Sequence, residues 1–147
     1  MTIFVDTSVW SLALRRDGEQ SALEVQALKD ALLGDDFVVT TGLVLQELLQ
    51  GVTGARSHSP ILSRFAALQL IQPDRDDHVA AAAIRNDCRR AGVQIGTVDA
   101  VLAQLCIRHD MTLLTTDKDL TNAARHCALT VWPAKRASNA KRDDARS

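Results

Sequence analysis

Short runs of β-forming residues alternate along this chain with longer stretches whose apolar residues recur at helical spacing. This alternation predicts strands connected through helices, and strands connected in this way run parallel. A parallel sheet needs helices on both faces to cover its apolar side chains. The expected strands are residues 3–5, 37–40, 70–73, 112–116 and 128–133, and the expected helices are residues 6–16, 21–36, 41–55, 59–70, 74–92, 97–110 and 119–127.

We therefore expect a three-layer α/β/α domain with a central, mainly parallel sheet of four to five strands. The 147 residues fit one domain, which we place at residues 1–132. Residues 133–147 carry five basic and two acidic residues, and we predict that they form a basic, disordered C-terminal tail. The rest of the chain is then net acidic, because the whole chain has a formal charge of −1.

Helix boundaries follow from capping residues and prolines. Thr7 or Ser8 is expected to cap the first helix, and Thr97 the helix over residues 97–110. Pro60 is expected in a first helical turn, where proline is tolerated.

Several classes of protein are disfavoured by the composition. The cysteines Cys88, Cys106 and Cys127 are far apart and odd in number, which argues against a disulfide framework or a zinc site and favours a reducing cytoplasm. The N-terminus lacks the pattern of a signal peptide, and no apolar run is long enough to span a membrane. We therefore expect a cytoplasmic protein with no membrane association.

Two apolar strands each end in an aspartate. Asp6 follows the first strand and Asp117 follows the fourth, in the stretch "LLTTDKDL". Since ligands of open parallel sheets bind outside the carboxyl ends of the strands, both aspartates are expected at the functional edge.

Two further acids interrupt apolar helices. Glu47 lies in "GLVLQELLQG" and is either a surface residue or a carboxylate that faces a polar site. Asp99 lies in the first turn of "TVDAVLAQLC", where it either stabilises the helix N-terminus or joins the same site.

A cluster of Asp6, Glu47, Asp99 and Asp117 requires compensation by a proton or a cation, because carboxylates that converge repel one another. Oxygen ligands of this kind suit Mg²⁺ or Mn²⁺. Zinc is disfavoured, since no histidine lies in these motifs.

In their order and local setting, the motifs "FVDTSVW", "LVLQELLQG", "GTVDAVLAQLC" and "LLTTDKDL" resemble those of the PIN-domain ribonucleases, and among these the VapC toxins of toxin–antitoxin pairs. The resemblance covers residues 2–132. It implies a PIN-like fold and a Mg²⁺- or Mn²⁺-dependent endoribonuclease that leaves a 5′-phosphate and a 3′-hydroxyl.

Carried over residue by residue, the resemblance implies that Asp6, Glu47, Asp99 and Asp117 are catalytic and that Asp6, Asp99 and Asp117 bind the metal. It further implies auxiliary roles for the neighbouring polar residues, which are Ser8, Thr115, Thr116 and Asp119. Leu120 replaces the phenylalanine common in the family, which we interpret as a change in packing.

The resemblance also implies partners: a VapB-like antitoxin, an RNA substrate (tRNA, or alternatively ribosomal RNA), a homodimer, and a heterotetramer or larger assembly with the antitoxin. Without the four candidate acids the formal charge becomes +3, which is compatible with RNA binding. The candidates for phosphate contacts are Arg15, Arg16, Arg56, Arg64 and Lys118.

Three other functions remain to be weighed. A haloacid dehalogenase-type phosphatase needs an aspartate two positions after Asp6, where this chain has Ser8. A receiver-type signalling domain needs a lysine after a late strand, and Lys118 does not lie at the required position in "TTDKDL". A non-catalytic module that binds RNA or docks an antitoxin is the main alternative, and an assay of metal-dependent cleavage distinguishes it from a nuclease.

Overall fold

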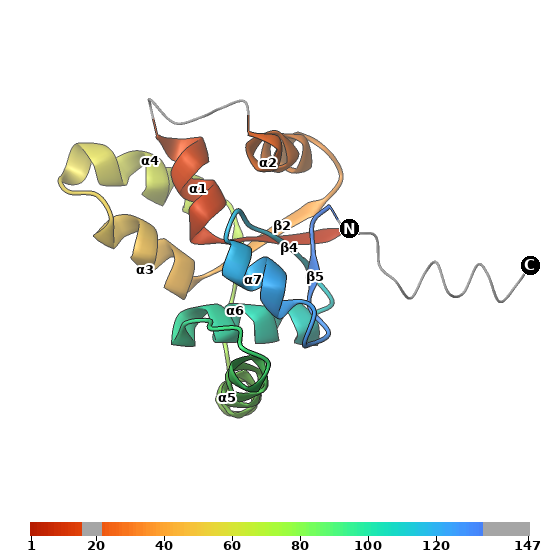
Figure 1. Cartoon of the computed structure of the whole chain (residues 1–147). Coiled ribbons are helices and arrows are strands. Elements are labelled where there is room, and N and C mark those ends of the chain that lie inside the picture. The colour runs from red at the N-terminus through yellow and green to blue at the C-terminus, as the bar shows by residue number, and fades with distance from the viewer. Residues whose placement is uncertain (16–21, 134–147) are drawn as a thin grey trace, which may run out of the picture.

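A computed structural model describes residues 1–15 and 22–133 of the chain (Figure 1). Its strands form one sheet in the order β3 (Gln69–Ile71), β2 (Phe37–Thr41), β1 (Thr2–Val5), β4 (Thr112–Leu114) and β5 (Thr130–Val131). Every neighbouring pair in this order is parallel. The predicted α/β class is confirmed, and the sheet has five strands.

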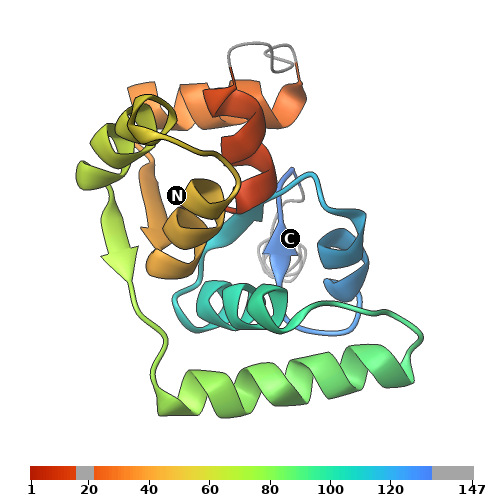
Figure 2. The ribbon, with the colours of Figure 1, turned by 90° about the vertical axis from the view of Figure 1, so that its left-hand side faces the viewer.

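Seven helices surround this sheet in the described part of the chain. Helices α1 and α2 lie over one face with α4 beside α1, whereas α6 lies over the other face and α5 packs on the outer side of α6 (Figures 1 and 2). The helices are α1 (Thr7–Leu14), α2 (Leu23–Leu33), α3 (Gly42–Gln50), α4 (Ala55–Ala66), α5 (Arg75–Arg90), α6 (Thr97–Arg108) and α7 (Lys118–Ala123).

The core is centred on β1 and β4, whose side chains are buried on both faces. Phe4 and Val5 of β1 and Leu113 and Leu114 of β4 are all inaccessible to solvent. Helix α6 is also buried on most of its surface, because it lies between the sheet and α5. These continuous apolar stretches are typical of the centre of a parallel α/β fold.

Two predicted helix caps were wrong, and in both helices the observed cap lies earlier in the chain. Asp6 rather than Thr7 or Ser8 caps α1, and Gly96 rather than Thr97 caps α6. Each cap keeps an extended backbone, and the next residue already belongs to the helix. The Asp6 carboxylate competes successfully for the free backbone N–H groups of the first turn.

Helix α4 begins earlier than predicted, so Pro60 lies inside the helix and not in its first turn. Gly54 precedes the helix with φ of 87°, a conformation that residues with a side chain rarely adopt. The His58 ring lies 3.1 Å from the Leu49 carbonyl oxygen and 3.0 Å from that of Val52, and these contacts tie the helix start to the end of α3. These contacts therefore place the start of α4 before Pro60, although a proline is more typical of a first helical turn.

The remaining features concern the chemistry of the chain as a whole. Cys88, Cys106 and Cys127 are free thiols. Among the described helices, none combines the length and the apolar character that crossing a bilayer requires. Arg16 and the predicted tail beyond Pro133 lie outside the described residues.

Candidate active site

Asp6 lies where β1 turns into α1, and the sheet register brings it to the end of β4. Val5 is in register with Leu114, and the Asp6 N–H donates to the Leu114 carbonyl oxygen at 3.1 Å. As the cap of α1, the Asp6 Oδ1 accepts hydrogen bonds from the N–H groups of Ser8 at 3.1 Å and Val9 at 3.4 Å. The carboxylate is thus fixed at the carboxyl edge of the two central strands.

Two hydroxyl groups complete the hydrogen bonding of Asp6. The Ser8 hydroxyl donates to Oδ1 at 2.6 Å, and the Thr115 hydroxyl donates to Oδ2 at 2.5 Å. Asp6 is 4% exposed, and its burial raises its pKa, while these hydrogen bonds act in the opposite direction because they stabilise the anion. The sequence placed Ser8 and Thr115 in this neighbourhood, and the structure shows them as donors to the buried carboxylate.

The same hydroxyls also accept hydrogen bonds from the segment after β4. Ser8 Oγ accepts from the Thr116 N–H at 3.0 Å, and Thr115 Oγ1 accepts from the Asp117 N–H at 2.9 Å. Asp117 then caps α7 through a 2.8 Å bond from the Asp119 N–H to its Oδ1. The two strand ends that carry Asp6 and Asp117 are therefore cross-linked by side-chain hydroxyls.

Asp99 enters the cluster from the first turn of α6. Its pKa is raised to about 6, first by burial and then by the negative charges of Asp117, Asp6, Glu47 and Asp119. Four carboxylates from three other segments of the chain therefore act electrostatically on Asp99. The structure brings together all four acids that were predicted as catalytic, and Asp119 as well.

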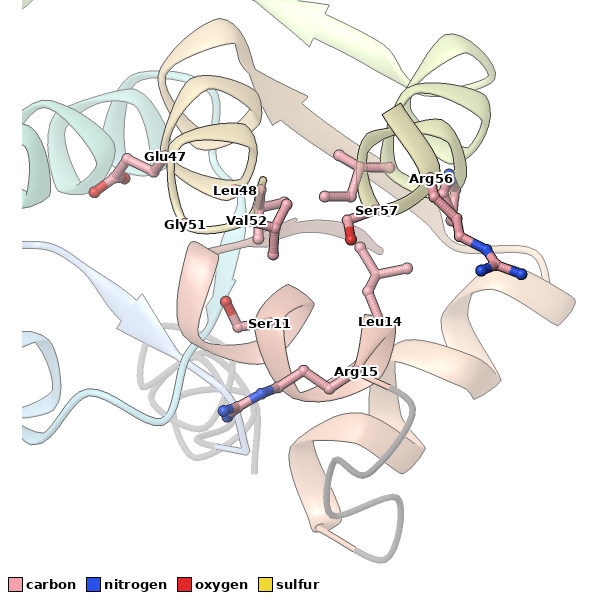
Figure 3. A pocket seen from close by; sticks show the side chains of 11 residues that line it. Ser11, Leu14, Arg15, Glu47, Leu48, Gly51, Val52, Arg56 and Ser57 are labelled. Atoms are coloured by element: carbon pink, nitrogen blue, oxygen red, sulfur yellow. The ribbon is translucent and has the colours of Figure 1, made fainter. Parts of the chain in front are cut away.

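Glu47 is held by a residue that the sequence did not single out for this role. The Thr7 hydroxyl donates to Glu47 Oε1 at 3.0 Å, which links the first residue of α1 to the middle of α3. The Glu47 carboxylate points toward the side of α6 (Figure 3). The only sequence signal for Thr7 is a hydroxyl next to Asp6, which the sequence pattern interprets as a helix cap.

The donor set fits a hard divalent cation by its chemistry. All candidate donors are carboxylate or hydroxyl oxygens, which Mg²⁺ and Mn²⁺ prefer, and a cation would relieve the repulsion that raises the pKa of Asp99. Within residues 1–15 and 22–133, no three acidic, histidine or cysteine side chains already meet around one point as metal ligands. The acids therefore supply suitable charge and donor atoms, and binding an ion also requires movement of their side chains.

The predicted RNA contacts lie at different places around this cluster. Lys118 is exposed and is the first residue of α7, between the two acids Asp117 and Asp119. Arg15 ends α1 and lines a groove that also includes Glu47 and Arg56 (Figure 3). Arg64 lies in the last turn of α4 and does not line this groove.

Comparison with known proteins extends these observations. The PIN domain family model matches residues 3–126, which is most of the chain. No curated protein matches the sequence.

Solved structures share the fold at low sequence identity. VapBC2 from Rickettsia felis, solved bound to a DNA fragment from the promoter, is 18% identical with a TM-score of 0.70, over 89% of this chain and 97% of that one. VapBC-5 from Mycobacterium tuberculosis, a member of the VapBC family of toxin–antitoxin systems, is 19% identical with a TM-score of 0.64, over 88% and 96%. VapC20 from the same organism, described as a Sarcin-Ricin loop cleaving toxin, is 20% identical with a TM-score of 0.62, over 87% and 98%.

Proposed function

The chain belongs to the PIN domain family, and from this premise we propose that it is a Mg²⁺- or Mn²⁺-dependent endoribonuclease that acts as the toxin of a toxin–antitoxin pair. The observation that carries the proposal is the environment of Asp99. Its pKa is raised to about 6 by burial and by four other carboxylates at the carboxyl edge of the sheet. No described lysine or arginine forms a salt bridge with these acids, and so much negative charge destabilises the fold unless a cation balances it, which is typical of a functional site.

The residues divide into those that hold the ion and those that hold these ligands in place. Asp6, Asp99 and Asp117 are the proposed metal ligands, and Glu47 completes the catalytic set. The ion, when bound, supplies positive charge to the scissile phosphate and lowers the pKa of a coordinated water. Ser8 and Thr115 hold Asp6, while Thr7 holds Glu47, so hydrogen bonds orient these two carboxylates before an ion binds.

The proposed substrate is a folded RNA, with tRNA as the first candidate. The described part of the chain offers few aromatic side chains for stacking on bases, which favours contacts to the RNA backbone and shape. The Sarcin-Ricin loop cleaved by VapC20 makes ribosomal RNA the second candidate. Cleavage of either RNA would inhibit translation.

The proposed partner is a VapB-like antitoxin, in a complex built on a toxin homodimer. VapBC2 and VapBC-5, which share the fold, support this part of the proposal. An assembly of this kind belongs in the cytoplasm, where its RNA substrate is found.

The test is cleavage of total cellular RNA by the purified chain, with Mg²⁺, with Mn²⁺ and with EDTA, followed by mapping of new 5′-phosphate ends. Asp6→Ala should abolish the cleavage, whereas Asp30→Ala, which removes an exposed acid of α2, should leave it unchanged. Discrete ends that require metal and Asp6 would support the proposal. Their absence in folded, antitoxin-free protein would favour the alternative, a non-catalytic module that binds RNA or docks an antitoxin.

A further inference from the structure

Two buried hydroxyl groups at the end of β2 have no hydrogen-bond partner among the described residues. They belong to Thr40 and Thr41, the last two residues of the strand, and both residues are inaccessible to solvent. A buried hydroxyl that bonds neither water nor protein costs free energy, so its presence calls for an explanation. Because the two threonines are successive residues of a strand, their side chains point to opposite faces of the sheet.

The sheet register places Thr41 beside Asp6. Val39 of β2 is in register with Phe4 of β1, so Thr41 stands opposite Asp6 two residues farther along. The ladder between β1 and β4, continued by one residue, sets Thr115 opposite Asp6 in the same way. On that side the continuation holds, since the Thr115 hydroxyl donates to the Asp6 carboxylate. Thr41 and Thr115 therefore flank Asp6 from its two neighbouring strands, on the same face of the sheet.

Helix capping does not account for the Thr41 hydroxyl. Thr41 is the N-cap residue of α3, but its side chain accepts no hydrogen bond from the first turn of that helix. At the ends of β1 and β4, by contrast, the side chains of Asp6 and Asp117 do accept such bonds. The Thr41 hydroxyl therefore remains available as a donor to another oxygen atom.

The Asp6 carboxylate can accept a further donor. The Ser8 N–H, the Ser8 hydroxyl and the Val9 N–H all bond its Oδ1, whereas the Thr115 hydroxyl is the only described donor to Oδ2. Each carboxylate oxygen has about two acceptor sites. The described acids do not yet meet around one point, so binding of an ion involves movement of their side chains. Such a movement can bring the Asp6 carboxylate within reach of a hydroxyl on the next strand.

Resting on the metal-dependent nuclease proposed above, we propose that Thr41 is a positioning residue for the cation: its hydroxyl is free in the ion-free protein and donates to the Asp6 carboxylate when an ion is bound. A hydrogen bond of this kind stabilises the charged carboxylate and fixes its direction, and both effects favour binding of a divalent cation. The free hydroxyl costs stability only in the ion-free fold. Its pairing in the ion-bound fold therefore makes cation binding more favourable.

The test compares Thr41→Val with Thr40→Val in the full chain, free of antitoxin. Valine is β-branched like threonine, so each variant loses one buried hydroxyl and keeps a similar shape. In EDTA both variants should have a Tm equal to or above that of the wild type, because neither hydroxyl has a described partner. Titration with MgCl₂ in a calorimeter should show about tenfold weaker binding for Thr41→Val, the effect of losing one hydrogen bond to a charged group. Binding should be unchanged for Thr40→Val, whose side chain lies on the other face.

A third variant separates the hydroxyl from the shape of the side chain. Thr41→Ser keeps the hydroxyl and should bind Mg²⁺ like the wild type. Unchanged Mg²⁺ binding in Thr41→Val, or equal weakening in Thr40→Val, would overturn the proposal. A Tm of Thr41→Val clearly below that of the wild type in EDTA would also overturn it, because the hydroxyl would then have a structural partner in the ion-free protein.

Failure of the Thr41 proposal is distinguishable from failure of the ribonuclease proposal. Mg²⁺ binding and RNA cleavage by the wild type are measured in parallel with the variants. Metal-dependent cleavage by the wild type, together with unaltered Mg²⁺ binding in Thr41→Val, would refute the role of Thr41 alone. Absence of Mg²⁺ and Mn²⁺ binding by the wild type would refute the metal site itself, and the role of Thr41 with it.

Discussion

Asp6 and Asp99 carry the same functional group in one cluster, but the chain stabilises their charges differently. Asp6 is almost completely buried, yet it accepts hydrogen bonds on both oxygens. Asp99 accepts no side-chain or backbone hydrogen bond from the described residues, and its pKa is raised to about 6. The negative charge of Asp99 is therefore the one that depends most on a cation.

The first prediction concerns the stability of Asp99→Asn. In the folded state the Asp99 pKa lies above the usual value of 3.8, so ionisation of this group opposes folding at every pH above about 6. Replacing it by Asn should raise the free energy of unfolding at pH 7 in EDTA by about 1–2 kcal/mol, after allowance for partial solvent screening. The variant should also lose RNA cleavage.

The pH dependence provides the check on this first prediction. The stabilising effect should fade as the pH falls from 6 toward 4, since wild-type Asp99 then becomes protonated and loses its unfavourable charge. Thermal unfolding of both proteins in EDTA from pH 4 to pH 8 measures this. A constant difference in Tm over that range, or a fully active Asp99→Asn enzyme, would contradict the assignment.

The second prediction concerns Thr115, whose hydroxyl donates to Asp6 and accepts from the Asp117 N–H. Thr115→Val removes one of the hydrogen bonds that lower the pKa of Asp6, so the acid limb of the pH–rate profile should move to higher pH. Loss of this buried hydrogen bond should also cost about 1–3 kcal/mol of stability.

Two comparisons separate the electrostatic effect of Thr115 from a packing effect. Thr115→Ser keeps the hydroxyl and should restore the pH profile. Thr121→Val, which removes an exposed hydroxyl bonded to the Asp117 carbonyl oxygen, should leave the profile unchanged. The role of Thr115 is refuted if its valine variant keeps the wild-type profile.

The sequence was sufficient to predict that these acids lie near one another, but not the contacts that orient them. Asp6 and Asp117 each follow a buried strand, and parallel strands present their carboxyl ends at one edge. Thr7 was not predicted as a partner of Glu47, because 40 residues separate them and a threonine at a helix start has several ordinary uses. Side-chain partners at such separations depend on how helices pack, which periodicity does not specify.

At the scale of the elements, α5 is attached to α6 by a buried acid. Asp77 is fully buried and forms a capping box with Asp74 at the start of α5. It also accepts from Arg108 at 2.7 Å and from Gln104 at 3.3 Å, both of which belong to α6. These interactions lower the pKa of Asp77 against the opposing effect of burial.

The third prediction is that Arg108→Met destabilises the fold by removing the cation that pairs with Asp77. We expect a loss of about 2–3 kcal/mol, which is less than for a fully buried pair because the Arg108 side chain is 39% exposed. Since the folded pKa of Asp77 is lowered, its stabilising contribution is present above pH 4 and is lost as the pH falls further. Urea unfolding at pH 7 and pH 3 measures both effects.

The matched control for this pair is Arg90→Met. Arg90 contacts Asp87 on the same helix, but their side chains are 76% and 58% exposed, so the pair should contribute almost nothing. Equal losses in the two methionine variants would mean that Asp77 does not depend on Arg108.

The extent of the elements was harder to predict than their order. The order of strands and helices agrees with the sequence pattern throughout the described residues, because it follows from periodicity and turn residues. β4 is shorter than expected, since Thr115 forms a hydrogen bond with Asp6 and Thr116 with Ser8 instead of extending the strand; β5 is also shorter than expected. Side-chain contacts in the candidate site therefore shorten a strand that its β-forming residues would extend.

At the scale of the whole molecule, the fourth prediction concerns the boundary of the domain. In the described residues the last strand of the sheet is β5, which ends at Val131, and the predicted tail begins two residues later. Removal of these residues should leave the Tm within about 1 °C, since surface changes away from the core have small effects on stability. A large loss of stability would contradict the domain boundary at residue 132.

The last prediction links the whole fold to the cation. A ligand that binds only the folded state stabilises it by about 2.7 kcal/mol at a concentration 100-fold above its Kd, which is about 5–10 °C in Tm for a chain of this size. Mg²⁺ should therefore raise the Tm of the wild type at pH 7.5, and the effect should decline below pH 6, where Asp99 becomes protonated. Asp99→Asn should begin with a higher Tm and respond less to Mg²⁺, whereas Asp30→Asn should behave like the wild type. Because K⁺ at equal ionic strength screens the repulsion without binding, a Tm rise of the same size in K⁺ would show that the acids require only screening, and the proposed metal site would be refuted.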